Sequence, residues 1–148
     1  MRVRPAGIDD LQSIVGFIAE EAQEAEGREQ DTETLQRGIG AALDDASIAQ
    51  YWLLVDDSGE ACGCTSIVKE WSDWNAGYYW WIQSMYIAPE HRGKGHLDTL
   101  LDAVREAGQQ EGCLDLRLYV HKDNGAAIRA YEKAGFADSP YQIMSRQV

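Results

Sequence analysis

An apolar run, a glycine-rich basic turn and an amphipathic helical pattern follow one another without a gap over residues 83–101. This order predicts a strand, a tight turn and a helix. Gly93 and Gly95 lack a Cβ, which allows a sharp turn and a close approach to a ligand. The N-terminus of a helix attracts anions, and Arg92 and Lys94 add two positive charges there. The stretch predicts a phosphate cradle, although glycines that only shape the connection would give the same pattern.

Neither of the two common nucleotide-binding fingerprints fits this turn. The chain has no Gly-x-x-x-x-Gly-Lys-Ser/Thr, and no Gly-x-Gly-x-x-Gly stands between an expected strand and helix. An acidic partner for a ribose or a magnesium ion is also missing at the expected spacing. A nucleotide-binding protein is therefore disfavoured.

Two later segments add to the turn: an apolar run at residues 116–120, and a segment at 124–136 that contains Asn124, Tyr131 and Gly-Phe. With these, the sequence resembles the GNAT superfamily of N-acetyltransferases. The hallmark of that family is Arg/Gln-x-x-Gly-x-Gly/Ala at the start of a helix, followed by an Asn, a Tyr seven residues later, and Gly-Phe. The resemblance spans residues 1–148 and is strongest over 82–136. One departure is Leu97, which stands where the second small residue of the hallmark is expected.

The resemblance implies that acetyl-coenzyme A is the co-substrate and that no metal is needed. The turn would hold the pyrophosphate, and free backbone groups at the end of the preceding strand would bind the pantetheine arm. A backbone N–H there would also polarise the thioester carbonyl. The implied cofactor-binding residues are Met85, Tyr86, Ile87, Arg92, Gly93, Lys94, Gly95, His96, Leu97 and Asn124.

Tyr131 is the catalytic residue that the resemblance implies, as the acid that protonates the leaving thiolate. It lies two helical turns after Asn124, so both side chains project from one side of the helix. A phenol with a pKa of about 10 is a suitable donor to a thiolate whose conjugate acid has a pKa of about 8.5 or somewhat more. The alternative is that Tyr131 is a packed helix aromatic.

The general base is not identified by the sequence. Some family members carry a carboxylate on the fourth strand, yet residues 80–84 contain none. Gln83 or Ser84 could hold a water that relays the proton, and Glu70 or Asp73 could turn into the acceptor cleft.

Six aromatic residues lie within eleven positions, namely Trp71, Trp74, Tyr78, Tyr79, Trp80 and Trp81. Tryptophan faces could hold a cationic amine, with Asp73 as a charge partner. Trp71, Asp73 and Gln83 are therefore candidate substrate-binding residues. The same cluster could equally be core and the interface of a homodimer.

Length and charge set the remaining bounds. The chain has 148 residues, which suits one domain, here a single acetyltransferase-like domain over 1–148. A net charge of −12 argues against nucleic-acid binding and is compatible either with a cationic acceptor or with solubility alone. No run is long and apolar enough for a membrane span, and residues 1–5 lack a signal-peptide core, so a cytoplasmic protein is expected.

Two smaller features each leave two interpretations open. Cys62 and Cys64 alternate along an expected strand, which predicts that both thiols point to one face, either as part of a metal site or as small buried hydrophobes. Residues 20–26, at the end of the first expected helix, are strongly acidic. They are either a mobile, solvated end or a lip over the site of a cationic acceptor.

Periodicity and turn residues predict an α/β fold. Strands are expected at residues 2–4, 51–55, 61–70, 78–87, 113–120 and 141–146, and helices at about 11–26, 32–43, 94–110 and 124–134. The expected architecture is a mixed, mainly antiparallel central sheet of six to seven strands flanked by about four helices. The resemblance adds a splayed parallel strand pair at the cofactor cleft.

Two functions follow from these observations. The leading one is transfer of an acetyl group from acetyl-coenzyme A to a primary amine of a small molecule or peptide, by direct attack with Tyr131 as the acid. The alternative is an acyl-coenzyme A-binding regulatory module of the same fold without turnover. Leu97 and the missing strand carboxylate motivate that alternative.

Overall fold

The computed structural model describes residues 1–148 and contains five strands and four α-helices. In chain order they are β1 (Arg2–Pro5), α1 (Leu11–Glu26), α2 (Thr32–Asp44), β2 (Gln50–Val55), β3 (Ala61–Ser72), β4 (Gly77–Ile87), α3 (His96–Gln110), β5 (Asp115–Leu118) and α4 (Gly125–Lys133). Single 3₁₀ turns precede α1 and α3, at Ile8–Asp10 and Pro89–His91.

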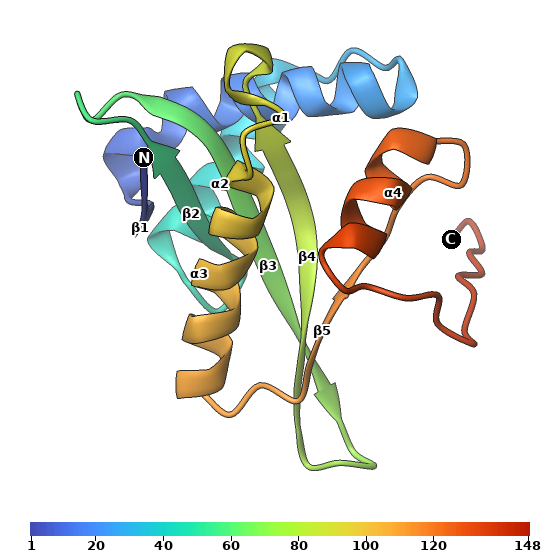
Figure 1. Ribbon diagram of the computed structural model, residues 1–148. Helices are drawn as coiled ribbons and strands as arrows, with labels where there is room; N and C mark the ends of the chain where they lie inside the picture. The colour runs from blue at the N-terminus through green and yellow to red at the C-terminus, as the bar shows by residue number, and fades with distance from the viewer.

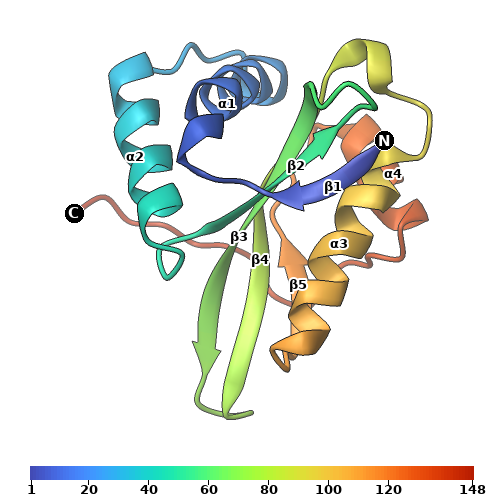
Figure 2. The same ribbon diagram turned by 90° about the vertical axis from the view of Figure 1, so that its left-hand side faces the viewer.

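The five strands form one sheet in the order β1-β2-β3-β4-β5. Neighbouring strands are antiparallel except β4 and β5, which are parallel and are joined through α3. Helices α1 and α2 cover one face of the sheet, and α3 covers the other (Figures 1 and 2). Helix α4 follows β5 at the edge of the sheet (Figure 1). The α/β class, the mixed sheet and the four helices were predicted from the sequence.

Apolar side chains fill both sides of the sheet. Ile14 and Val15 of α1 pack with Leu53 on one side, whereas Leu101 and Val104 of α3 belong to a cluster that surrounds Trp80 on the other. The i, i+3/i+4 spacing of apolar residues along each helix produces these buried stripes. None of the helices combines the length and the apolar character that a bilayer crossing requires.

The parallel pair of β4 and β5 separates part of the way along. Pairing runs from Tyr79 with Asp115 to Ile82 with Leu118 and then ends. At this point Gln83 is the extra residue of a β-bulge, because Ile82 pairs with Ile67 and Ser84 with Ser66. From residue 83 to residue 87, β4 therefore has no strand partner on its β5 side.

The predicted sixth strand at residues 141–146 is wrong, and with it the expectation of six to seven strands. The segment after α4 runs along the outer side of the molecule without joining the sheet (Figure 1). Tyr141, Ile143 and Met144 are largely exposed. Their spacing indicates an extended chain, but a strand also needs a neighbour that pairs with its backbone, and this segment forms no ladder with β5.

The prediction that Cys62 and Cys64 share a face is also wrong. The register between β2 and β3 shifts at Val55, where β3 carries an extra residue. This bulge reverses the alternation, so Cys62 packs with Leu100 on the α3 side and Cys64 packs on the α1 side. Burial raises the pKa of both thiols. They are separate buried hydrophobes in two parts of the core.

Candidate functional site

The turn before α3 has the backbone geometry that the cradle requires. Gly93 has a φ of 71° and Gly95, the N-cap of α3, has a φ of 81°. Both values lie in the left-handed region, which glycine adopts without strain. The first N–H groups of α3 have no acceptor within the helix, and the amides of residues 93–95 donate no hydrogen bond within the protein. These N–H groups are available to an anion.

Leu97, the departure from the hallmark, does not crowd this turn. Its side chain is half-buried and packs against the apolar cluster that includes Ile82 and Leu101. The Cβ side of the residue therefore faces the core, and its backbone N–H lies at the open end of α3. One of the two reasons for a module without turnover is thereby weakened.

The two basic side chains of the turn have partners in this structure. Arg92 donates two hydrogen bonds of 2.9 Å from Nη2 to the carboxylate of Glu24, and its Nε donates to the carbonyl of Ile87 at 2.7 Å. Its guanidinium also lies 5.3 Å from the centre of the Tyr86 ring. Lys94 Nζ donates to the carbonyl of Glu90 at 2.9 Å. The sequence showed the charges but not their partners.

The acidic end of α1 rests on the splayed end of β4. Glu21 Oε1 accepts a hydrogen bond of 2.9 Å from the backbone N–H of Met85, and Glu20 accepts one from the hydroxyl of Tyr86. Burial, together with Glu20, raises the pKa of Tyr86. This end is thus not uniformly solvated: Glu21 is half-buried, whereas Glu20 and Glu24 are exposed and bound to side-chain partners.

Glu21 was not among the site residues expected from the sequence, yet a signal for it exists. It follows Ile14 and Ile18 at spacings of seven and three residues, which places it on the buried face of α1. A carboxylate that continues an apolar stripe must find a polar partner. Here the partner is the unpaired N–H of Met85.

Helix α4 was predicted from the sequence, and it begins after Asn124 and contains Tyr131. Asn124 is the N-cap, and its Oδ1 accepts a hydrogen bond of 3.1 Å from the N–H of Ala127. Tyr131 is half-buried, and its ring packs edge-on against Phe136 with 5.8 Å between the ring centres. Burial, with a smaller contribution from the negative charge of Glu21, raises the pKa of Tyr131 to about 12. Its hydroxyl is therefore a protonated donor at neutral pH.

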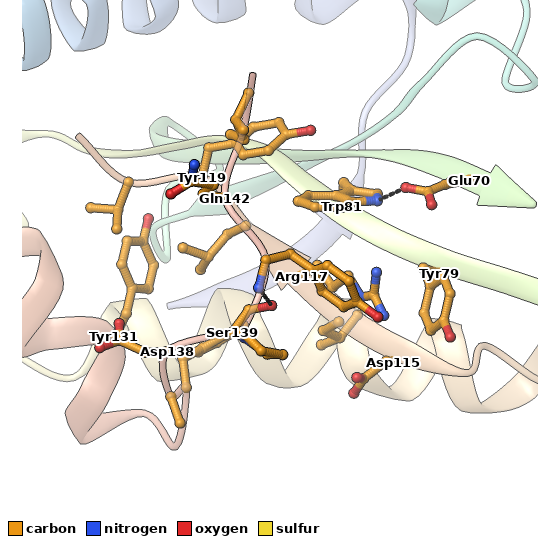
Figure 3. Close-up of a pocket in the computed structure, with 18 of the residues that line it drawn as sticks. Glu70, Tyr79, Trp81, Asp115, Arg117, Tyr119, Tyr131, Asp138, Ser139 and Gln142 are labelled. Atoms are coloured by element: carbon orange, nitrogen blue, oxygen red, sulfur yellow. Dashed lines mark hydrogen bonds between the residues drawn. The ribbon is translucent and has the colours of Figure 1, made fainter. Parts of the chain in front are cut away.

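A cavity of about 900 Å³ lies beside Tyr131, enclosed by β3, β4, β5, α4 and the segment after α4 (Figure 3). Trp71 and Asp73, two of the three substrate-binding candidates, line it. Gln83 does not line it and lies exposed at the bulge of β4.

The aromatic cluster of the sequence is divided between the core and this cavity. Trp80 is buried against Trp52, whereas Trp81 lines the cavity and stacks on Tyr119 with 4.6 Å between the ring centres. Trp81 Nε1 donates a hydrogen bond of 2.7 Å to Glu70, and Arg117 lies 3.5 Å from the centre of the Tyr79 ring (Figure 3).

Arg117 and Tyr119 are cavity residues that sequence reasoning missed, because β5 reads only as a short apolar strand. The charged side chains that line the cavity are mostly acidic, with Arg117 as the basic one. The acidic ones are Glu70, Asp73, Asp115, Glu132 and Asp138.

Comparison with known proteins agrees with this geometry. Residues 11–136 match the family model described as the acetyltransferase (GNAT) family. The crystal structure of a possible acetyltransferase from Clostridium difficile 630 is 32% identical, covers 99% of this chain and 97% of its own, and superposes with a TM-score of 0.92.

Two curated relatives are also acetyltransferases. Mycothiol acetyltransferase of Corynebacterium aurimucosum is 31% identical over 112 residues, which are 72% of this chain and 36% of the relative. Streptothricin acetyltransferase of Streptomyces lavendulae is 32% identical over 98 residues, which are 66% of this chain and 49% of the relative. The alignments thus span less than half of each curated relative. The match over residues 11–136 shows that the chain belongs to the acetyltransferase (GNAT) family.

Proposed function

We propose that this protein transfers an acetyl group from acetyl-coenzyme A to a primary amine of a small molecule or peptide. One observation carries the proposal: β4 separates from β5 after Ile82, so the backbone N–H of Met85 lies at a strand end that β5 does not cover. Tyr131 of α4, which lines the cavity and keeps its proton at neutral pH, supports the role of acid for the thiolate. Family membership supports the reaction class.

The residues present fit acetyl-coenzyme A. The unpartnered amides at residues 93–97, with the positive end of α3, suit its pyrophosphate. The edge of Met85, Tyr86 and Ile87, which no strand covers on the β5 side, suits the amides of the pantetheine arm once Glu21 releases the N–H of Met85 and Arg92 the carbonyl of Ile87. The amide nitrogen of Asn124 is available to the same arm, since only Oδ1 is used by the cap.

The reaction requires one bond to form and one to break. The amine lone pair attacks the carbonyl carbon of the thioester, the C–S bond breaks, and the amine nitrogen loses a proton. Met85 N–H stabilises the negative charge that develops on the carbonyl oxygen. Tyr131 gives its hydroxyl proton to the departing thiolate and regains one from solvent.

A cationic acceptor fits the cavity beside Tyr131. Its carboxylates would attract an amine, and the faces of Trp71 and Trp81 would cover the apolar part of the molecule. Both curated relatives are named after small molecules, which favours a small-molecule acceptor over a peptide. Gln83, at the bulge where β4 separates from β5, is a further candidate contact to the acceptor.

Calorimetry with acetyl-coenzyme A, together with a thiol-release assay over a panel of amines, tests this function. We expect saturable binding and amine-dependent release of the thiol. Tyr131→Phe should bind acetyl-coenzyme A like the wild type and lose a factor of about 10²–10⁴ in kcat. Tyr78→Phe, outside the cavity, is the matched control and should keep both the affinity for acetyl-coenzyme A and the kcat of the wild type.

Other results would contradict the proposal in different ways. Binding without thiol release on any amine would favour the regulatory module. No binding at all would refute the cradle. Full activity in Tyr131→Phe would be consistent with acetyl transfer and would refute the role of Tyr131 as the acid.

A further inference from the structure

We propose that Glu21 of α1 is the general base that removes the proton from the acceptor amine. The inference rests on the proposed acetyl transfer and supplies the group that the fourth strand lacks. Glu21 is half-buried, and its Oε1 lies 2.9 Å from the backbone nitrogen of Met85. Met85 lies beyond the last pair of β4 with β5, at the splayed end of the strand. The carboxylate therefore reaches the place where the thioester carbonyl is expected.

The neighbouring acids are less suited to this role. Glu20 accepts from the Tyr86 hydroxyl, and Glu24 forms a two-point ion pair with Arg92. Glu70, on the exposed half of β3, is held by Trp81 Nε1 at 2.7 Å. Glu21 has a backbone N–H as its partner, and a thioester carbonyl can take that N–H in its place. Binding of the acyl group thus frees the carboxylate beside the reacting carbon.

The surroundings also favour proton uptake by Glu21. Burial raises its pKa above the ordinary value of a glutamate, and the nearby charge of Glu24 acts in the same direction. Hydrogen bonds from Met85 N–H and from Ser84 lower the pKa but do not cancel the effect of burial. A carboxylate that holds a proton more firmly is a better base for an amine.

Four other ionisable groups interact electrostatically with Glu21, each from a different element. They are Glu24 on α1, Tyr51 on β2, Cys64 on β3 and Tyr131 on α4. Burial raises the pKa of Tyr51, Cys64 and Tyr131 too, so all three are neutral near pH 7. Within this group, Glu21 and Glu24 carry the negative charge, and Glu24 is paired with Arg92.

The carboxylate of Glu21 takes one proton from the ammonium form of the acceptor, and the freed lone pair attacks the carbonyl carbon. The C–S bond then breaks, and Tyr131 protonates the thiolate. Glu21 becomes neutral and loses this proton to solvent once the products leave, so it is a carboxylate again before the next turnover.

Glu21→Gln tests the base without removing the acceptor for Met85 N–H, because a carboxamide oxygen can take the same hydrogen bond. We expect kcat at neutral pH to fall by about 10²–10⁴-fold. The affinity for acetyl-coenzyme A should be unchanged or tighter, since a neutral amide competes less for the N–H. The loss of kcat relative to the wild type should become smaller as the pH rises, because solvent then deprotonates the amine. Glu26→Gln, on the exposed end of the same helix, is the matched control and should behave like the wild type.

The possible results distinguish a failure of the proposed base from a failure of the proposed acetyl transfer. A wild type that releases thiol, with a Glu21→Gln variant of equal activity, would overturn the base and leave the transfer reaction intact. A loss of kcat in Glu21→Gln that is independent of pH and comes with weakened binding of acetyl-coenzyme A would also overturn the assignment of Glu21 as the base. That result would indicate a structural role for Glu21. A wild type that releases no thiol would refute the transfer reaction, and the role of Glu21 with it.

Discussion

Three glutamates on one turn and a half of α1 have three different partners. Glu20 meets a phenol, Glu21 a backbone N–H, and Glu24 a guanidinium. Only Glu24 is neutralised by an opposite charge, and burial raises the pKa of Glu21. Glu24 therefore fixes Arg92, whereas Glu21, which has no cationic partner, is available for proton transfer.

The charge of Glu21 should also control the acidity of Tyr131. A nearby negative charge disfavours the tyrosinate, and Glu21 contributes to the raised Tyr131 pKa of about 12. Glu21→Gln removes that charge, so the pKa of Tyr131 should fall. During catalysis, protonation of Glu21 would make Tyr131 a better acid at the moment the thiolate leaves. NMR titration of ¹³C-labelled tyrosine measures this pKa, with Tyr131→Phe to assign the signal. An unchanged or higher value in Glu21→Gln would show that the two groups are not coupled.

At the scale of elements, the contact between β3 and β4 positions the splayed strand end. Gly63 of β3 pairs with Ile87, and a Cβ at Gly63 would lie 2.5 Å from the carbonyl oxygen of Tyr86. No flexible side chain can give way there, because the obstacle is backbone. Glycine at this position therefore allows the close approach of β3 to the end of β4 that carries Met85.

Gly63→Ala should lower the free energy of unfolding by about 1–3 kcal/mol and weaken binding of acetyl-coenzyme A, because β4 must move away. Gly38→Ala is the matched control: it lies inside α2, and a Cβ there meets nothing within 4 Å. That change should raise stability by about 0.5–1 kcal/mol, since alanine favours a helix. Urea unfolding and calorimetry measure both variants. Equal stability of Gly63→Ala and wild type would contradict the close contact.

Local patterns in the sequence were sufficient to predict most of the helices and strands. The turn at Gly93 and Gly95, the cap at Asn124 and the hairpin of β3 and β4 all depend on residues within a few positions of one another. The cysteine faces were mispredicted because a bulge changes the alternation, and a bulge leaves little trace in a single sequence. The missing sixth strand depends on a partner edge that local spacing does not report.

The site was predicted less fully than the fold, for a related reason. Tyr131 and the turn at residues 92–97 each belong to a short local motif, but the contacts that surround them do not. Glu21 and Met85 are 64 positions apart, and Arg92 and Glu24 are 68 apart. Such pairings arise only once α1 has packed on β4, so the sequence supplied the acidic residues of α1 without their partners.

At the scale of the whole molecule, the cavity beside Tyr131 has one wall that does not belong to the sheet or its helices. Tyr141, Gln142 and Ile143 line it from the segment after α4. Tyr141 and Ile143 are nevertheless 71% and 68% exposed, so this wall contributes little to the core. A wall of this kind can shape the acceptor site without supporting the fold.

Deletion of residues 141–148 should therefore separate acceptor binding from stability. Few buried contacts are lost, so the Tm should fall by no more than about 2–4 °C, which corresponds to about 1 kcal/mol in a domain of this size. The affinity for acetyl-coenzyme A should be unchanged, because the cradle and β4 are untouched. The KM for the amine should rise, because one side of the cavity is gone. Deletion of residues 145–148, none of which lines the cavity, is the matched control and should change neither the Tm nor the KM for the amine. A fall in Tm of about 10 °C or more would instead mean that the segment supports the fold, and an unchanged KM would mean that the acceptor binds elsewhere.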